Sequence, residues 1–173
     1  MFELFMYFCS GMKSIPIKRS KELAPLSRDH HQGLLLCWKI RNGVNNHIDN
    51  KRIARYLIFS FREELSEHFR QEEDILFSLL ADDEPLKQQA LGQHASLRAQ
   101  VEEVTSQKEP DTTLLLAFAD TLDTHIRFEE RKLFPFIEQT IDEGKLQTAG
   151  KKIDACQHTD QLQWEDQFWK KIN

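Results

Sequence analysis

Residues 68–77 read HFRQEEDILF, and residues 125–134 repeat this stretch as HIRFEERKLF. Both copies share the pattern His, apolar, Arg, any residue, Glu, Glu, two variable residues, Leu, Phe. In each copy a histidine and a glutamate are four residues apart, so on an α-helix they project from the same face. These pairs are His68 with Glu72 and His125 with Glu129. The repeat therefore predicts two helices that each present an imidazole and a carboxylate to a shared site.

Apolar residues recur at helical spacing around both copies and in two further segments. They predict helices at about 27–44, 50–81, 85–107 and 112–140. Ser27 is expected to cap the first helix, and Pro135 to kink or end the fourth. The sequence thus predicts an all-α fold, an up-down-up-down four-helix bundle, because short turns join long amphipathic helices.

The remaining segments are assigned to the same domain, which spans residues 1–173. Its core covers about 20–140, preceded by a lead at 1–19 and followed by a short helical extension at 141–173. Within that extension an amphipathic helix is expected at about 145–156, and the aromatic tail Trp164–Trp169 is expected to pack on the bundle or on another chain.

Composition and charge narrow the function classes. The net charge of −5 and the pI near 5.8 argue against a nucleic-acid partner, which requires a basic face.

Cys9, Cys37 and Cys156 are far apart and form no CxxC pair, which favours a reducing, cytoplasmic location over a disulfide framework. The apolar start is short for a membrane span and carries Glu3, so no membrane association is expected, and residues 1–11 are interpreted as an extension before a second methionine.

Each of the four expected helices has a histidine on or near its apolar face. They are His30 or His31, then His68, His94 and His125, accompanied by Glu72 and Glu129. A single histidine on a helix is more often a hydrogen-bonded core or surface residue than a ligand. Four in-phase imidazoles and two carboxylates are costly to bury without a cation, so the set predicts two metal ions. Imidazole and carboxylate donors without thiolate suit iron or manganese, and also zinc, whereas calcium and magnesium prefer oxygen ligands.

The first helix offers two adjacent histidines. His31 is followed at helical spacing by Leu34, Leu35 and Trp38, and this more apolar face favours it as the ligand, with His30 beside the site or on the surface. The glutamates that follow the two paired ones are rotated by about 100°. They are interpreted as solvated or as partners of nearby Arg and Lys side chains: Glu73 and Glu130.

At these residues the sequence resembles the hemerythrin-like (HHE cation-binding) family, over about residues 20–140. The resemblance rests on Asp29-His30-His31, His68-x-x-x-Glu72, a lone His94 and His125-x-x-x-Glu129. It implies two iron ions, oxo- or hydroxo-bridged. One iron would be held by His31 and His68 and the other by His94 and His125, with Glu72 and Glu129 linking them.

Two departures from the oxygen-carrying members of that family bear on function. Arg98 stands where those members have a second histidine, and it is expected either to pair with a site carboxylate or to point outward. The fourth helix has His-x3-Glu in place of His-x4-Asp. This more symmetrical set looks more like the domain of iron–sulfur-centre repair proteins, although the cysteine-bearing N-terminal domain of those proteins is absent here.

Three function hypotheses follow. The first is a binding module, monomer or homodimer, that binds or senses oxygen, nitric oxide or iron. The second is a di-iron redox enzyme or iron-centre repair protein that handles nitric oxide or peroxide; the pattern assigns no catalytic residue and leans away from an enzyme. The third is a metal-free bundle whose aromatic tail docks a partner.

Overall fold

The computed structural model describes residues 19–156 and 164–170, and the regular secondary structure within these ranges is entirely helical. The expectations for residues 1–18, including Cys9, lie outside the described residues, as does the part of the C-terminal extension at 157–163. The elements are α1 (Ala24–Asn45), α2 (Asn50–Ser60), η1 (Phe61–Leu65), α3 (Ser66–Gln71), η2 (Glu72–Leu76), η3 (Phe77–Leu79), α4 (Pro85–Ser106), α5 (Thr112–Phe128), η4 (Glu129–Leu133), α6 (Phe134–Thr140) and α7 (Glu143–Cys156).

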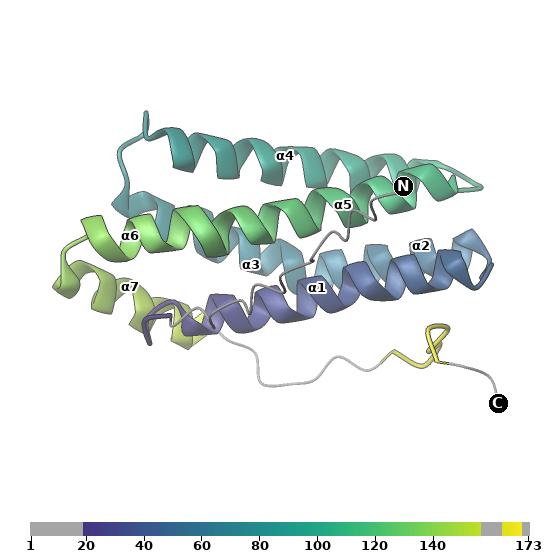
Figure 1. Ribbon diagram of the computed structural model, residues 1–173, viewed down its shortest axis with the longest axis horizontal. Helices are drawn as coiled ribbons and strands as arrows, with labels where there is room; N and C mark the ends of the chain where they lie inside the picture. Colours follow the sequence, from purple (N-terminus) through teal and green to yellow (C-terminus); the bar gives the residue numbers. More distant parts are fainter. Residues whose placement is uncertain (1–18, 157–163, 171–173) are drawn as a thin grey trace, which may run out of the picture.

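These elements form four long helical rods within the described residues (Figure 1). The rods are α1, then α2 through η3, then α4, then α5 through α6. Helix α1 packs along α2 and α5, and α4 packs along the same two elements, so the four rods surround a common interior. Helix α7 packs against η2 at the end of the rods where α6 finishes (Figure 1).

The Ser27 cap is wrong, and so is one of the two alternatives for Pro135, that it ends the fourth helix. Helix α1 begins at Ala24, before Ser27, because a proline suits the first helical turn; the Ser27 hydroxyl donates to Glu130 Oε1 at 2.6 Å. Pro135 does not end the fourth rod. It occupies the first turn of α6, directly after η4, and the rod continues to Thr140.

The buried face of α1 combines large apolar side chains with small ones: Leu26, Leu36 and Ile40 with Gly33, Cys37 and Gly43. A Cβ atom on Gly33 would lie 2.8 Å from the terminal methyl group of Ile126 on α5, so the glycine leaves room for that side chain. Cys37, one turn later, is fully buried, whereas Trp38 is 50% exposed. The buried face of α1 is therefore the one that carries Cys37, and Trp38 lies on the other side.

The apolar core consists of two clusters. One contains Phe69 and Leu122 and occupies the half of the rods toward the turn between α1 and α2. The other contains Phe77 and Phe134 and occupies the half covered by α7. Along the second and fourth rods, the His68–Glu72 and His125–Glu129 pairs lie where residues of the first cluster give way to residues of the second.

The described part of the aromatic tail packs on the bundle as turns, not as a helix. Phe168 is 5% exposed and lies against Gly43, where a Cβ atom would come within 2.8 Å of its ring. Asp166 accepts two hydrogen bonds from the Arg52 guanidinium, at 3.0 and 2.6 Å. The prediction that the tail packs on the bundle is thus confirmed for residues 164–170, far along the rods from α7 (Figure 1).

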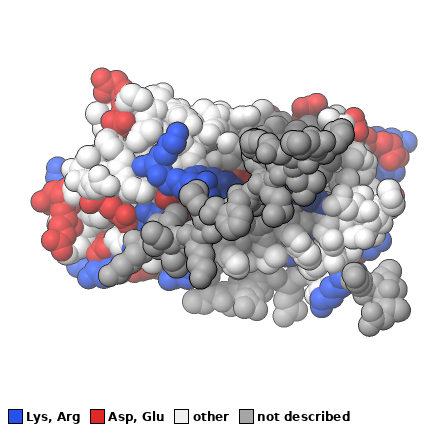
Figure 2. Space-filling model, in the orientation of Figure 1, with Lys and Arg blue, Asp and Glu red and all other residues white. Residues whose placement is uncertain are grey.

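On the face drawn in Figure 2, basic and acidic side chains are interspersed at both ends of the molecule. Among the described residues, no helix combines the length and the apolar character needed to cross a lipid bilayer.

Candidate metal centre

Six buried polar side chains from all four rods meet in the interior. They are His30 from α1, His68 and Glu72 from the second rod, His94 from α4, and His125 and Glu129 from the fourth rod. Each is between 0 and 3% exposed, which is rare for ionisable groups that have no compensating charge.

These side chains form two groups that share both carboxylates. His30 and His68 form one group with Glu72 and Glu129, and His94 and His125 form the other with the same two glutamates. Within each group, ligand-type atoms of all four residues lie within 4.8 Å of one another. One cation in each group would therefore be within reach of two imidazoles and two shared carboxylates.

The structure places His30, not His31, in this centre. His30 is 3% exposed, whereas His31 is exposed and lines a surface recess with Arg28. The preference for His31 is therefore wrong. It rested on Leu34, Leu35 and Trp38, none of which is buried. The apolar residues of α1 that are buried share the face of His30, and they include Leu26, Cys37 and Ile40.

The Nδ1 atom of each histidine faces an oxygen outside the centre. The pairs are His30 with Glu130 at 2.8 Å, His94 with Glu73 at 2.7 Å, His125 with Gln93 Oε1 at 3.1 Å and His68 with Asp29 at 3.3 Å. An ionised carboxylate and an amide oxygen can only accept, so Nδ1 carries the hydrogen in each pair. In a neutral imidazole the other nitrogen, Nε2, is then left with a lone pair.

The Nε2 atoms and the shared carboxylates converge without enough donors to satisfy them. The Nε2 atoms of His30 and His68 and all four carboxylate oxygens of Glu72 and Glu129 lack a hydrogen-bond partner of good geometry. Several lie close to one another, for example His30 Nε2 and Glu129 Oε2 at 3.0 Å.

The other two imidazoles show the same conflict, because His94 Nε2 and His125 Nε2 face each other at 3.2 Å. With hydrogens on both Nδ1 atoms, the two Nε2 lone pairs would repel. Buried acceptors without donors are costly, and cations at the two groups would satisfy them all. The residues present therefore fit a pair of metal ions, and the nitrogen and oxygen donors suit iron, manganese or zinc.

Without a cation, the same centre draws in protons. Burial lowers the pKa of His30, but the surrounding carboxylates more than offset this and hold that pKa well above its usual range. Carboxylates acting against burial also raise the pKa of His68 to about 8 and that of His94 to about 9. Burial and the neighbouring charge raise the pKa of Glu129 to about 7. Cation binding would have to release such protons, as is usual for imidazole sites.

Both shared glutamates begin a π-helical turn. Glu72 starts η2 and Glu129 starts η4, which is the same position in the two repeats. A π turn is wider than an α turn, so consecutive side chains are separated by less than the usual 100°. Each repeat can therefore use two adjacent glutamates, the first toward the centre and the second toward a histidine on a neighbouring rod.

The second glutamates hold the histidines that the repeats do not contain. Glu73 bonds His94 and also accepts from Arg98 at 2.8 Å. Glu130 bonds His30 and accepts from Arg19 at 2.7 Å. The prediction that they pair with basic side chains is confirmed, and the two side chains are partly exposed, at 27% and 18%. Neither alternative for Arg98 holds as stated, because Arg98 pairs with a carboxylate outside the centre, that of Glu73, and its side chain is 40% exposed.

The last phenylalanine of each repeat completes the enclosure. Phe77 stacks on His94 with ring centroids 5.9 Å apart, and Phe134 stacks on His30 at 5.2 Å. Each repeat thus supplies one histidine, one shared carboxylate, and a Glu and a Phe that hold the lone histidine of another rod. The sequence pattern predicted the histidine and the shared carboxylate of each repeat. It did not predict that the second Glu and the Phe contact a histidine on another rod. Gln93 was missed altogether, and no spacing rule singles it out.

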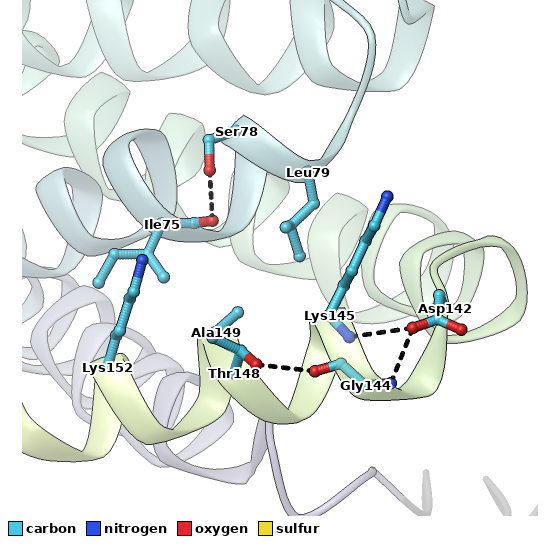
Figure 3. Close-up of a pocket in the computed structure, with 9 residues that line it drawn as sticks. All are labelled: Ile75, Ser78, Leu79, Asp142, Gly144, Lys145, Thr148, Ala149 and Lys152. Atoms are coloured by element: carbon cyan, nitrogen blue, oxygen red, sulfur yellow. Dashed lines mark hydrogen bonds between the residues drawn. The ribbon is translucent and has the colours of Figure 1, made fainter.

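A separate surface groove lies between α7 and the end of the second rod (Figure 3). Lys145 and Lys152 from α7 flank it opposite Ile75 and Leu79. None of its lining residues belongs to the buried histidine and glutamate groups.

Comparison with known proteins gives one match. The family model described as the hemerythrin HHE cation binding domain matches residues 22–137, which is more than half of the chain and includes all six buried residues of the centre. No curated protein and no solved structure matches the chain.

Proposed function

Because the chain belongs to the hemerythrin HHE cation-binding family, we propose that its buried centre holds two iron ions and that the protein binds or senses a small diatomic ligand. His30 and His68 would hold one ion, His94 and His125 the other, and Glu72 and Glu129 both. The observation that carries the proposal is the convergence of the imidazole Nε2 atoms on the two shared carboxylates, whose four oxygens all lack a hydrogen-bond partner.

The surroundings of the centre support a small ligand. Its six side chains are almost fully buried, and aromatic rings stack on two of the imidazoles. Only a molecule of a few atoms would reach it without moving a helix, which favours oxygen or nitric oxide over a larger substrate. The up-down-up-down order of the rods belongs to the same proposal, since the short turns at 46–49, 80–84 and 107–111 suit antiparallel neighbours.

The chain itself positions the ligands and keeps the centre dry. Outer hydrogen bonds to Nδ1 fix the tautomer, so that every Nε2 lone pair faces inward. When bound, a pair of iron ions would supply open coordination positions and redox chemistry to a small molecule. The surrounding phenylalanines exclude water from the same space.

The adjacent histidines of α1 provide a matched test of the metal centre. The protein is stripped with a chelator and reloaded with ferrous iron without oxygen, and metal per chain and melting temperature are measured. We expect two ions in the wild type and in His31→Ala, fewer than two in His30→Ala, and a higher melting temperature after reloading. Equal losses in the two variants, or a wild type that binds fewer than two ions, would contradict the proposal.

Ligand binding is tested separately on the reloaded protein. Stoichiometric changes in absorption on adding nitric oxide or oxygen would support a binding or sensing function. Consumption of nitric oxide or peroxide in the presence of a reductant, faster than with free iron, would instead support the redox enzyme.

A further inference from the structure

The groove between α7 and the second rod is large enough for a small molecule. It has a volume of about 340 Å³, at the lower end of the range of about 300 to 1,000 Å³ that is usual for ligand pockets. Helix α7 forms one wall, and η2 and η3 form the other (Figure 3). Because α7 lies beyond residues 22–137, the groove is not a feature of the matched family domain alone.

The floor of the groove is apolar. Ile75 and Leu79 pack against the second core cluster but remain partly exposed. The residue of α7 that lines the groove between its two lysines is Ala149, whose small side chain leaves the space open (Figure 3). An apolar group placed in the groove would therefore remove apolar surface of Ile75 and Leu79 from water, which favours its binding.

Two lysines flank this apolar floor. Lys145 and Lys152 are seven residues apart on α7, which is about two turns or 10 Å along the helix (Figure 3). Among the residues that the structure describes, neither ammonium group has a hydrogen-bond or ion-pair partner. Both charges are therefore free to pair with a ligand in the groove.

The one carboxylate among the described lining residues is already engaged. Asp142 accepts from the backbone N–H groups of Gly144 and Lys145, at 3.0 and 3.2 Å, and so caps the start of α7. Its charge is directed at the amide groups of the helix start, which stabilise it. Two lysines without partners against one capping carboxylate give the groove a net positive charge, which attracts anions.

We propose that this groove binds a small amphipathic anion, whose apolar chain or ring lies on Ile75 and Leu79 and whose carboxylate pairs with Lys145 or Lys152. Burial of the apolar part supplies the affinity, and the lysines select the sign of the charge. An inorganic anion would leave the floor uncovered, and a neutral apolar molecule would leave both ammonium groups without a partner. The proposal does not rest on the metal centre, because no residue of that centre lines the groove.

Straight-chain carboxylates of increasing length test the apolar floor. Isothermal titration calorimetry of the purified full chain compares acetate, hexanoate, octanoate and decanoate. We expect no measurable binding of acetate, and a gain in affinity of about 2-fold for each CH₂ group added from hexanoate onward, because an open groove buries each group only partly. Leu79→Ala, which removes part of the floor, should weaken decanoate binding by about 5-fold.

Two charge-matched double variants test the lysines. Lys145→Gln with Lys152→Gln should weaken decanoate binding by about 5-fold, the upper end of what an exposed ion pair contributes. Lys108→Gln with Lys151→Gln removes the same charge from exposed positions outside the groove, and it should leave decanoate binding unchanged. All four lysines are exposed, so both double variants should keep the melting temperature of the wild type.

Four results would overturn the proposal: no binding of decanoate by the wild type, acetate binding as tightly as decanoate, equal losses in the two double variants, or no effect of Leu79→Ala. Binding to phosphatidylglycerol vesicles without binding of free decanoate would also overturn it, because the occupant would then be a lipid surface. A wild-type dimer that Leu79→Ala converts to a monomer, measured by light scattering, would assign the groove to a second copy of the chain and would overturn it as well.

Discussion

The two repeats are alike where they face the centre and different where they face outward. Each contributes a histidine and a glutamate that is 0% exposed and begins a π turn. Their second glutamates have different surroundings. Glu130 is covered by Arg19, whose side chain is 6% exposed, and by the Ser27 hydroxyl, whereas Glu73 pairs with Arg98, which is 40% exposed. The residues that face the centre are therefore the same in the two repeats. The residues that pair with the second glutamate differ, because a different part of the chain covers each repeat.

The largest expected effect tests whether the residues that face the centre are equivalent in the two repeats. Glu72→Gln and Glu129→Gln should each lower the affinity for both ions by at least about 100-fold, because each glutamate belongs to both groups and the loss of outer partners alone costs 10- to 100-fold. The amount of iron that remains bound per chain after dialysis measures this loss of affinity. Glu102→Gln, at an exposed site on α4, should retain two ions. If either centre variant kept one firmly bound ion, the two repeats would not be equivalent.

A smaller effect should distinguish the two arginines that pair with the second glutamates. Arg19→Gln removes bonds to Glu130 and Glu138 from a buried guanidinium, and we expect it to lower the free energy of unfolding by about 2 kcal/mol. Arg98→Gln should cost less than about 1 kcal/mol, because its ion pair is half exposed. Urea denaturation of the metal-free proteins measures both. Equal costs would remove the distinction drawn between the repeats.

The smallest effect concerns salt. In about 1 M sodium chloride the Debye length is about 3 Å, so the stability cost of Arg98→Gln should largely vanish. The cost of Arg19→Gln should mostly persist, because its bonds are shielded from the solvent. Repeating the denaturation series at low and high salt checks this, and a cost for Arg19→Gln that also vanished would show that Arg19 is solvated.

The helical segments and most of the centre could be predicted because their signals are local. Helical spacing located the four rods to within a few residues, and the repeated His-x3-Glu pattern identified Glu72 and Glu129. The histidine of α1 could not be identified in this way. The apolar residues after His31 favoured the face of Leu34 and Trp38, but α1 packs the face of Cys37 into the bundle, and this buries His30.

The residues that accept hydrogen bonds from the histidine Nδ1 atoms could not be predicted from the sequence pattern, for a similar reason. Glu73 and Glu130 seemed to be turned away because the pattern assumed a regular α-helix, whereas a π turn begins one residue earlier in each repeat. Gln93 and Asp29 face histidines on other rods, and sequence separation contains no information about such contacts.

By itself the sequence determined that helices of this chain carry paired imidazoles and carboxylates on their inner faces, since side chains four residues apart must share a side of a helix. Only the tertiary structure decided which of two adjacent histidines enters the centre and which oxygen supports each one. Those choices depend on how closely the rods approach and on where the helix widens, and both are set by packing between segments far apart in the chain.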